Sequence, residues 1–216
     1  MATSEQPKDR PRLVVGISGA SGIVYGLRTL DAARELGVET HLVMSRAAAL
    51  TLAQETDFSL AQAQGRADVV HKPGDIGAAI ASGSFRTLGM IVAPCLVRSM
   101  SEIATGVTAS LLTRAADVTL KERRPLVLMV RESPLHLGHL RTMAKLAQMG
   151  AVIAPPMPAF YARPSSLEEM VDQSVGRALD LFGLSWTPVK RWGQDVGPVG
   201  PLKDGPPKDD PPGDEA

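Results

Sequence analysis

The sequence predicts a single α/β domain, built on a parallel β-sheet with helices on both faces. Short apolar, β-branched segments alternate with segments of helical periodicity along most of the chain. Glycines follow several of the helical segments, as at Gly37 and Gly150. Such alternation is typical of parallel strands joined by helical crossovers. The 216 residues suffice for one such domain with a substantial core.

The predicted strands and helices follow one another in order. Strands are expected at residues 13–17, 39–44, 67–71, 90–94, 125–130 and 151–154. Helices are expected at residues 23–36, 46–55, 99–104, 109–122, 137–148 and 165–182, the last capped by Ser165 or Ser166. The polar stretch around 57–64 is predicted to be a connection. Ligands of such sheets bind beyond the carboxyl ends of the strands, so the loops there are the expected site.

Composition narrows the class of protein. Lys plus Arg and Asp plus Glu both number 23, which argues against nucleic-acid binding. No apolar run is long enough to span a membrane, and residues 1–11 lack the apolar stretch of a secretory signal. The single cysteine, Cys95, excludes an intramolecular disulfide and fits a reducing compartment. A cytoplasmic protein is therefore expected.

The two ends of the chain differ in composition from its middle. Residues 193–216 are rich in Pro, Gly and Asp and almost lack large apolar side chains. Such a segment buries too little surface to offset its conformational entropy. We therefore expect a folded domain at residues 11–192, a disordered N-terminus at 1–10 and a disordered tail at 193–216.

The first predicted strand leads straight into a turn of small residues. Residues 18–22 read Ser-Gly-Ala-Ser-Gly, and a helical pattern begins at Ile23. Gly19 and Gly22 would let backbone N–H groups approach an anion, and Ser21 would cap the helix or touch the ligand. The spacing is not that of a dinucleotide fingerprint, so a mononucleotide phosphate such as that of a flavin is favoured. An ordinary turn without a ligand explains the segment equally well.

Charged residues follow two other predicted strands. Arg98 and Ser99 come after the strand at 90–94, and Arg131-Glu132 ends the strand at 125–130. The first pair suits a phosphate or flavin ring, and Glu132 suits acid–base work among cations. A charged pair on the surface is an equally good explanation of Arg131-Glu132. Cys95 is expected to be a buried packing residue rather than a nucleophile.

Two further segments carry cations or aromatic rings. Arg114 and Lys121 lie seven residues apart, so a helix would place them on one face, with Arg123 and Arg124 nearby. They form either a phosphate site or a solvated face paired with acidic neighbours. The proline-rich loop ending in Tyr161, with Arg177 and Trp192 further on, suits an apolar chain with an anionic head. Each of these segments taken singly is also explained by packing on the core.

No metal site is expected. His136 and His139 are three residues apart on a predicted helix, but one cysteine and no patterned carboxylates accompany them. They are predicted to be polar residues of a helix surface or an interface.

Taken together, these segments resemble one known family. They are, in order, Gly19-Ala20-Ser21-Gly22 with Tyr25-Gly26, His41-Leu42-Val43-Met44-Ser45, Glu55-Thr56, Ile80-Ala81-Ser82-Gly83-Ser84-Phe85, Ala93-Pro94-Cys95, Leu111-Leu112-Thr113-Arg114-Ala115-Ala116-Asp117, Lys121-Glu122-Arg123-Arg124, Arg131-Glu132-Ser133-Pro134-Leu135, Met149-Gly150-Ala151-Val152-Ile153 and Met157-Pro158-Ala159-Phe160-Tyr161. The set resembles the flavin prenyltransferase family (UbiX-type), within the homo-oligomeric flavin-binding proteins related to cysteine decarboxylases.

The resemblance implies a fold, a reaction and partners. The sheet would be Rossmann-like or flavodoxin-like, in a dodecamer built from trimers with active sites at subunit junctions. The reaction would join the dimethylallyl group of dimethylallyl phosphate to N5 and C6 of reduced FMN, releasing inorganic phosphate without a metal. The product, prenylated FMN, would serve a UbiD-type decarboxylase.

The resemblance also assigns roles to residues. FMN would be held by Gly19, Ala20, Ser21, Ser45, Arg98, Ser99 and Arg131. The prenyl phosphate would be held by Arg114, Lys121, Tyr161 and Arg177, with Trp192 closing the pocket. Proton transfer would fall to Ser21, Glu55 and Glu132.

The chain departs from the family pattern near the expected flavin site. Leu96 stands where a hydroxyl is usual, Arg98 replaces a lysine, and Ala109-Ser110 replaces a polar pair. These departures keep a second hypothesis open, a non-catalytic carrier of FMN or prenylated FMN. A cysteine-type decarboxylase is ranked last, because the catalytic histidine it needs after the first helices is not in place.

Overall fold

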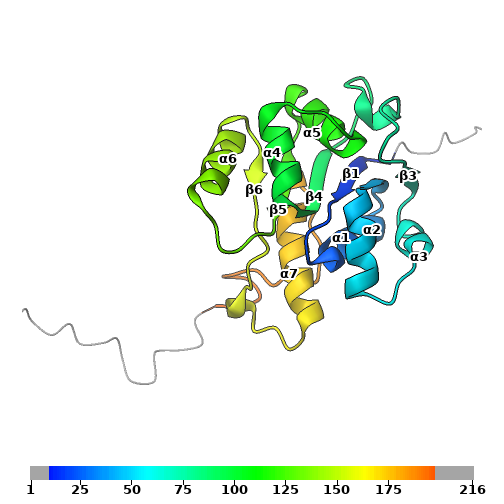
Figure 1. The fold of residues 1–216 in the computed structure, drawn as a ribbon. Helices are drawn as coiled ribbons and strands as arrows, with labels where there is room; N and C mark the ends of the chain where they lie inside the picture. The colour runs from blue at the N-terminus through cyan, green and yellow to red at the C-terminus, as the bar shows by residue number, and fades with distance from the viewer. Residues whose placement is uncertain (1–9, 198–216) are drawn as a thin grey trace, which may run out of the picture.

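The fold is a six-stranded parallel sheet between two helical layers. A computed structural model describes residues 10–197 of the chain (Figure 1). The strand order is β3-β2-β1-β4-β5-β6, and every neighbouring pair is parallel. The strands are β1 (Arg12–Ile17), β2 (Glu39–Met44), β3 (Val69–His71), β4 (Gly89–Cys95), β5 (Leu126–Val130) and β6 (Val152–Ile153). The predicted fold class is confirmed.

The helices divide between the two faces of the sheet. They are α1 (Ile23–Glu35), α2 (Arg46–Glu55), α3 (Leu60–Gln64), α4 (Val97–Thr105), α5 (Leu111–Lys121), α6 (Leu137–Gln148) and α7 (Leu167–Leu179), with short 3₁₀ helices at Ala79–Ala81, Phe160–Ala162 and Asp180–Phe182. Apolar residues of α1, α2, α3 and α7 belong to one core cluster, and those of α4, α5 and α6 belong to the other.

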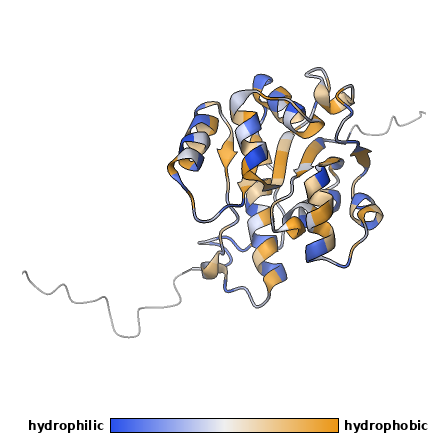
Figure 2. Cartoon of the chain, in the orientation of Figure 1, coloured by the Kyte–Doolittle hydropathy of each residue, from blue (hydrophilic) through white to orange (hydrophobic). Residues whose placement is uncertain are grey.

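The strands supply both clusters by alternation. In β1, Leu13, Val15 and Ile17 face the cluster with α1 and α7, and Val14 faces the other cluster. Most strand residues are apolar, which Figure 2 shows by the orange colour of the central strands, although β2 begins with Glu39-Thr40-His41. Burial on both faces explains why the strand segments read as continuous apolar runs in the sequence.

The strand order also determines where a ligand can bind. The chain moves outward from β1 to β2 and β3, then returns to β4 on the other side of β1 and continues to β5 and β6. The helices that follow β1 and β4, α1 and α4, therefore cover opposite faces of the sheet. This switch point is the usual ligand site of open parallel sheets.

Several predicted boundaries need correction. The stretch expected to be a connection contains α3, whose capping box joins Ser59 and Gln62. Helix α4 begins at Val97, two residues before the prediction, so Arg98 and Ser99 lie in its first turn. The last long helix is capped by Ser166 and ends at Leu179, where the chain tightens into a 3₁₀ turn. Hydrophobic periodicity does not reveal such boundaries, because short polar segments contain too few apolar residues to show a period.

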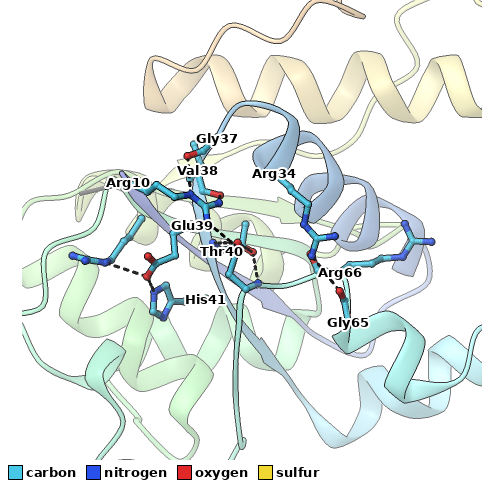
Figure 3. Close-up of polar contacts among 11 residues, drawn as sticks. Arg10, Arg34, Gly37, Val38, Glu39, Thr40, His41, Gly65 and Arg66 are labelled. Carbon is cyan, nitrogen blue, oxygen red and sulfur yellow. Dashed lines mark hydrogen bonds and ion pairs between the residues drawn. The ribbon is translucent and has the colours of Figure 1, made fainter. Parts of the chain in front are cut away.

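The amino-terminal edge of the sheet carries a dense polar network (Figure 3). Arg10 donates to the carbonyl oxygens of Gly37 and Val38, and Arg34 donates to those of Gly65 and Arg66. His41 is buried here and contacts the carboxylate of Glu39 at 2.8 Å. This network joins the start of β2 to both flanking loops, at the edge opposite the switch point.

The predicted disordered segments lie mostly outside the described residues, which exclude 1–9 and 198–216. Residues 193–197, the start of the predicted tail, form a turn in which Gly193 donates to the carbonyl of Val196. Among residues 10–197, none of the helices has the length and apolar character needed to cross a bilayer.

Candidate active site

The predicted flavin residues gather at the carboxyl edge of the sheet. Gly19, Ala20 and Ser21 follow β1, Ser45 follows β2, Arg98 and Ser99 follow β4, and Arg131 and Glu132 follow β5. Adjacent parallel strands bring these loops side by side around the switch point. The sheet thus assembles residues that are up to 113 positions apart in the sequence.

The N-terminus of helix α1 is hydrogen-bonded to a carboxylate of the same chain, that of Glu55. Both carboxylate oxygens of Glu55 accept from the N–H of Gly22, at 3.1 and 2.9 Å, and one accepts from Ile23 at 2.9 Å. The expected helix cap from Ser21 is wrong, because the N-cap is Gly22 and no side chain caps the helix from that position. The amides at 22 and 23, expected to receive a phosphate, are thus occupied by Glu55.

Glu55 is held in its ionised form. Burial would raise the pKa of its carboxyl, but hydrogen bonds from Ser21, Ile23 and Gly22 and the charge of Arg131 together lower that pKa. The structure therefore brings Ser21, Glu55 and Arg131 into one cluster. A carboxylate that is ionised and bonded to a hydroxyl is suited to accept a proton through it.

Gly19 is required by packing within the protein. A Cβ at this position would lie 2.3 Å from the Cβ of Ala47 and 2.7 Å from its backbone carbon. The turn after β1 therefore lies directly against the first turn of α2. Only glycine permits this approach, which places the turn beside the cavity that Ala47 lines.

That cavity, the α2–α4–α5 cavity, has a volume of ≈ 420 Å³. It is lined by Ser45, Arg46, Ala47, Pro73, Gly74, Leu96, Arg98, Ser99, Glu102, Ala109 and Ser110. The N-termini of three helices meet there. Ser45 caps α2 and Ser110 caps α5, whereas Leu96 gives α4 no side-chain cap. The free amides of α4 and two nearby arginines make the cavity suited to a phosphate.

A second cavity, the α7 cavity, gathers most of the predicted donor ligands. It has a volume of ≈ 340 Å³ and is lined by Tyr161, Arg177, Lys190, Arg191, Trp192 and Gln194. The rings of Tyr161 and Trp192 meet edge to face at 5.9 Å. Asp180 accepts from Arg177 at 2.5 Å and from two nitrogens of Arg191 at 2.9 and 2.7 Å. The structure thus brings Tyr161, Arg177 and Trp192 together.

The other two predicted donor ligands lie on a different helix. Arg114 pairs with Asp117 at 2.8 Å, and Lys121 pairs with Glu122. Helix α5 runs back toward the start of β5, so Lys121 lies near the amino-terminal edge of the sheet. Helices α5 and α7 cover opposite faces of the sheet (Figure 1). Within one chain, therefore, the two sets of cations do not share a cavity.

Glu132, which follows β5, and Cys95, which ends β4, differ in their burial. Glu132 is half-buried, and its carboxylate accepts from the N–H of Ser133 at 3.1 Å. Cys95 is fully buried, and burial raises the pKa of its thiol to about 12. A protonated, inaccessible thiol is inert, which confirms the prediction of a packing role.

Some supporting residues escaped the sequence reasoning. The Ser18 hydroxyl donates to the Pro94 carbonyl at 2.8 Å and accepts from the N–H of Leu96 at 2.6 Å, linking the loops after β1 and β4. Gln173 and Asp180 of the α7 region contact Tyr161 and Arg177. Their helical spacing with Arg177 was a usable signal for the last two, but nothing local marks Ser18.

Comparisons with known proteins now bear on this site. A family model described as Flavoprotein matches residues 1–179. The flavin prenyltransferase UbiX of Escherichia coli K12 is 59 % identical over 175 residues, covering 81 % of this chain and 93 % of that protein. The UbiX protein of Thauera aromatica is 55 % identical over 181 residues, covering 84 % and 93 %. The chain belongs to the UbiX-type flavin prenyltransferase family.

Solved structures agree with this membership. The structure of AnUbiX (PadA1) in complex with FMN and dimethylallyl pyrophosphate matches with a TM-score of 0.84 at 49 % identity, covering 85 % of this chain and 97 % of that one. A dodecameric FMN-dependent UbiX-like decarboxylase from Escherichia coli O157:H7 matches at 0.82 and 47 %, covering 84 % and 98 %. A cysteine decarboxylase, TvaF, shares the fold at 0.58 and only 15 % identity.

Proposed function

We propose that this chain is a flavin prenyltransferase that transfers a dimethylallyl group from dimethylallyl phosphate to reduced FMN. Membership of the UbiX-type family supports the reaction, and the neighbour bound to FMN and dimethylallyl pyrophosphate supports both substrates. The observation that carries the proposal is the cluster of Ser21, Glu55 and Arg131 at the switch point, beside the α2–α4–α5 cavity.

The residues present fit the phosphate end of FMN. Ser45, Ser99 and Arg98 line a cavity into which α4 directs uncapped amides, so a phosphate there would meet hydroxyls, N–H donors and a cation. Gly19, Ala20, Ser21 and Arg131 would then adjoin the rest of the flavin. The proposed phosphate position is therefore at the N-termini of α2 and α4, whereas the sequence favoured the turn after β1.

Reduced FMN supplies the nucleophilic N5 and C6 atoms. The allylic C–O bond of the donor breaks and phosphate departs with the electron pair, while N5 bonds to the allylic carbon and loses its proton. The double bond of the transferred group then takes up one proton, its tertiary carbon bonds to C6, and C6 loses one proton, so the flavin gains C₅H₈ in all. We assign the N5 proton to Glu55 through the Ser21 hydroxyl, because that carboxylate accepts from the N–H of Gly22, next to Ser21, and its pKa is lowered, against the effect of burial, by hydrogen bonds that include one from Ser21. Glu132 would handle the remaining proton or that of the leaving phosphate.

The departing phosphate would be stabilised by fixed donors. Tyr161 and Arg177 line the α7 cavity, and Trp192 would cover the allylic group and exclude water. Arg114 and Lys121 do not line this cavity and lie on α5, across the sheet from α7, so they would reach the donor from a neighbouring subunit.

A homo-oligomer is therefore part of the proposal. Exposed apolar side chains cluster before and on α6, at Leu135, Leu137 and Leu140, and in the loop before α7, at Met157 and Phe160. Apolar patches of this kind are typical of protein interfaces. A dodecamer, as in the neighbour from Escherichia coli O157:H7, is the assembly we propose.

We also propose a recipient for the product and a location in the cell. A UbiD-type decarboxylase would receive the prenylated FMN. A cytoplasmic location is supported by the one cysteine, Cys95, which is a free thiol.

One experiment tests the reaction. The purified protein is incubated anaerobically with reduced FMN and dimethylallyl phosphate, and the flavin is then analysed by mass spectrometry. A product heavier than reduced FMN by one C₅H₈ unit, formed over many turnovers, is the expected result. Unchanged FMN from folded, FMN-loaded protein would refute it, and tight binding of finished prenylated FMN without turnover would favour the carrier hypothesis.

A further inference from the structure

The proposed donor ligands Tyr161 and Arg177 are held by two other side chains of the α7 region. Gln173, Arg177 and Asp180 are spaced by four and three residues, so they share one face of the helix and its end. Gln173 is only 3 % exposed, whereas Tyr161 is 42 % exposed. Buried or half-buried groups thus support ligands that are open to the cavity.

The orientation of the Gln173 amide is fixed by the backbone of Lys190. Its Oε1 accepts from the Lys190 N–H at 3.0 Å, and its Nε2 donates to the Lys190 carbonyl at 2.9 Å. A backbone N–H only donates and a carbonyl only accepts, so the reversed amide would lose both bonds. The Nε2 atom is therefore the one that lies 3.2 Å from the Tyr161 hydroxyl.

This orientation determines what the Tyr161 hydroxyl can do. An amide NH₂ group is a donor, so the hydroxyl oxygen accepts from Gln173. The hydroxyl hydrogen is then left for another acceptor. Since Tyr161 lines the α7 cavity, that hydrogen is available to an anionic oxygen bound there.

Asp180 holds the side chain of Arg177, the cation that lines the cavity beside Tyr161. Its carboxylate accepts from Nη1 of Arg177 and from both Nη atoms of Arg191. Within residues 10–197, no bond from Nε or Nη2 of Arg177 is seen, and the side chain is 57 % exposed. Arg177 thus keeps its Nε and Nη2 donors for a ligand, while the Arg191 side chain binds the same carboxylate.

We infer that Gln173 and Asp180 are positioning residues of the donor site, Gln173 by directing the Tyr161 hydroxyl hydrogen toward the anion and Asp180 by holding Arg177 beside it. The inference rests on the proposed function only for the identity of the anion, an allylic phosphate. Neither residue is required to touch the donor. Gln173 also bonds the backbone of Lys190 and Asp180 bonds the side chain of Arg191, the two residues before Trp192, whose ring meets that of Tyr161.

The test for Gln173 is a double-mutant cycle with Tyr161. Gln173→Met, Tyr161→Phe and the double variant are compared in the full-length protein. Each single change is expected to raise the Kd for dimethylallyl phosphate, and its KM, about tenfold, because one hydrogen bond to a charged group is lost or misdirected. The double variant is expected to be no weaker than Tyr161→Phe, since Gln173 acts through that hydroxyl. Additive losses would overturn the inference.

The test for Asp180 uses a conservative rescue. Asp180→Asn is expected to raise the donor KM about tenfold with kcat at saturating donor changed less than threefold. Asp180→Glu keeps the charge and is expected to recover part of the loss. An equal fall in FMN affinity would show a merely structural role and overturn the assignment, because FMN is expected in the other cavity.

A matched control separates positioning from general destabilisation. Gln62 on α3 also accepts from a backbone N–H, at 2.8 Å, so Gln62→Met removes a comparable bond far from the donor site. It is expected to leave donor Kd unchanged. Donor binding is measured by calorimetry with dimethylallyl phosphate, which needs no turnover. If wild-type protein binds donor but forms no product, the proposed reaction fails and the inference stands; if wild type does not bind donor, the inference fails as well.

Discussion

The carboxylate of Glu55 accepts hydrogen bonds from the backbone N–H groups of both Gly22 and Ile23, each at 2.9 Å to the same oxygen. Residues 33 positions apart thereby close the N-terminus of α1. The same carboxylate is bonded to Ser21 and lies in the field of Arg131. One group thus caps a helix and is ready to accept a proton.

The two roles of Glu55 are separable by substitution. Glu55→Gln keeps an acceptor oxygen for the helix but removes the charge, so the free energy of unfolding should change by less than about 1 kcal/mol. The rate of prenyl transfer should fall by about 10²–10⁴, the range for one acid–base group. Anaerobic single-turnover kinetics and urea denaturation measure the two effects. Gln54→Ala, at the exposed neighbouring position, is the control, and a Glu55→Gln rate within threefold of wild type would contradict the proton role.

Two N-cap serines provide a matched test of the flavin cavity. Ser45 accepts from the N–H of Ala48 at the start of α2, and Ser59 accepts from that of Gln62 at the start of α3. Each change to alanine should cost about 1 kcal/mol of stability. Only Ser45→Ala should also weaken FMN binding, by roughly tenfold, because only Ser45 lines the α2–α4–α5 cavity. Titration of FMN fluorescence decides this, and equal FMN affinities in the two variants would exclude Ser45 as a ligand.

Mixed oligomers test whether the donor site is shared between subunits. Lys121→Ala and Arg177→Ala should each lower activity at least a hundredfold if both cations stabilise the leaving phosphate, as proposed. If Lys121 and Arg177 come from different chains, oligomers assembled from both variants contain some sites with neither defect. Co-expressed variants should therefore regain a measurable fraction of wild-type activity in the purified mixed oligomer. Activity no higher than that of the two separate variants would place both residues in one chain's site.

The histidine pair at the edge of β2 and β3 predicts an acid-sensitive stability. His41 Nδ1 and His71 Nε2 lie 3.0 Å apart, so one proton between them is favourable and two are not. Burial and the charge of His41 lower the pKa of His71, although Asp75 opposes the shift. The folded state then binds this proton less readily than the unfolded state does. Stability is fully present above the unfolded value of about 6.5 and falls as the pH drops below it.

His71→Gln should weaken that pH dependence. Urea unfolding midpoints are measured at pH 7.5, 6.5 and 5.5, above the range where the carboxylates of Glu39 and Asp68 lose their charge. The wild-type midpoint is expected to fall toward pH 5.5 more steeply than that of the variant. Parallel curves would show that His71 does not carry the effect.

The Cys95 thiol should not react with thiol reagents in the native protein. Its burial and its raised pKa, about 12, leave almost no accessible thiolate at pH 8. A chromogenic disulfide reagent should react with none of the native protein within an hour and with one thiol per chain after denaturation. Cys95→Ala should retain activity within about threefold while losing about 1 kcal/mol of stability, owing to the cavity it leaves. Rapid native labelling would contradict the buried, inert role.

The sequence by itself determined the fold class, because buried parallel strands leave continuous apolar runs and their crossover helices leave a different period. It also predicted which loops hold the flavin, since Ser21, Ser45, Arg98 and Arg131 lie within a few residues of the ends of predicted strands. The family membership came from short segments that keep their order along the chain. These signals depend on residues that are near one another in the sequence, so they can be recognised without the three-dimensional structure.

Only the tertiary structure decided which charges meet. Glu55 caps α1, Asp180 joins Arg177 to Arg191, and Gln173 aims the hydroxyl of Tyr161. It also showed that the close approach of Ala47 requires glycine at position 19, and that Lys121 and Arg177 lie on helices that cover opposite faces of the sheet. Hydrogen bonds form between groups within about 3 Å in space, and neither periodicity nor spacing encodes the distance between residues on different elements.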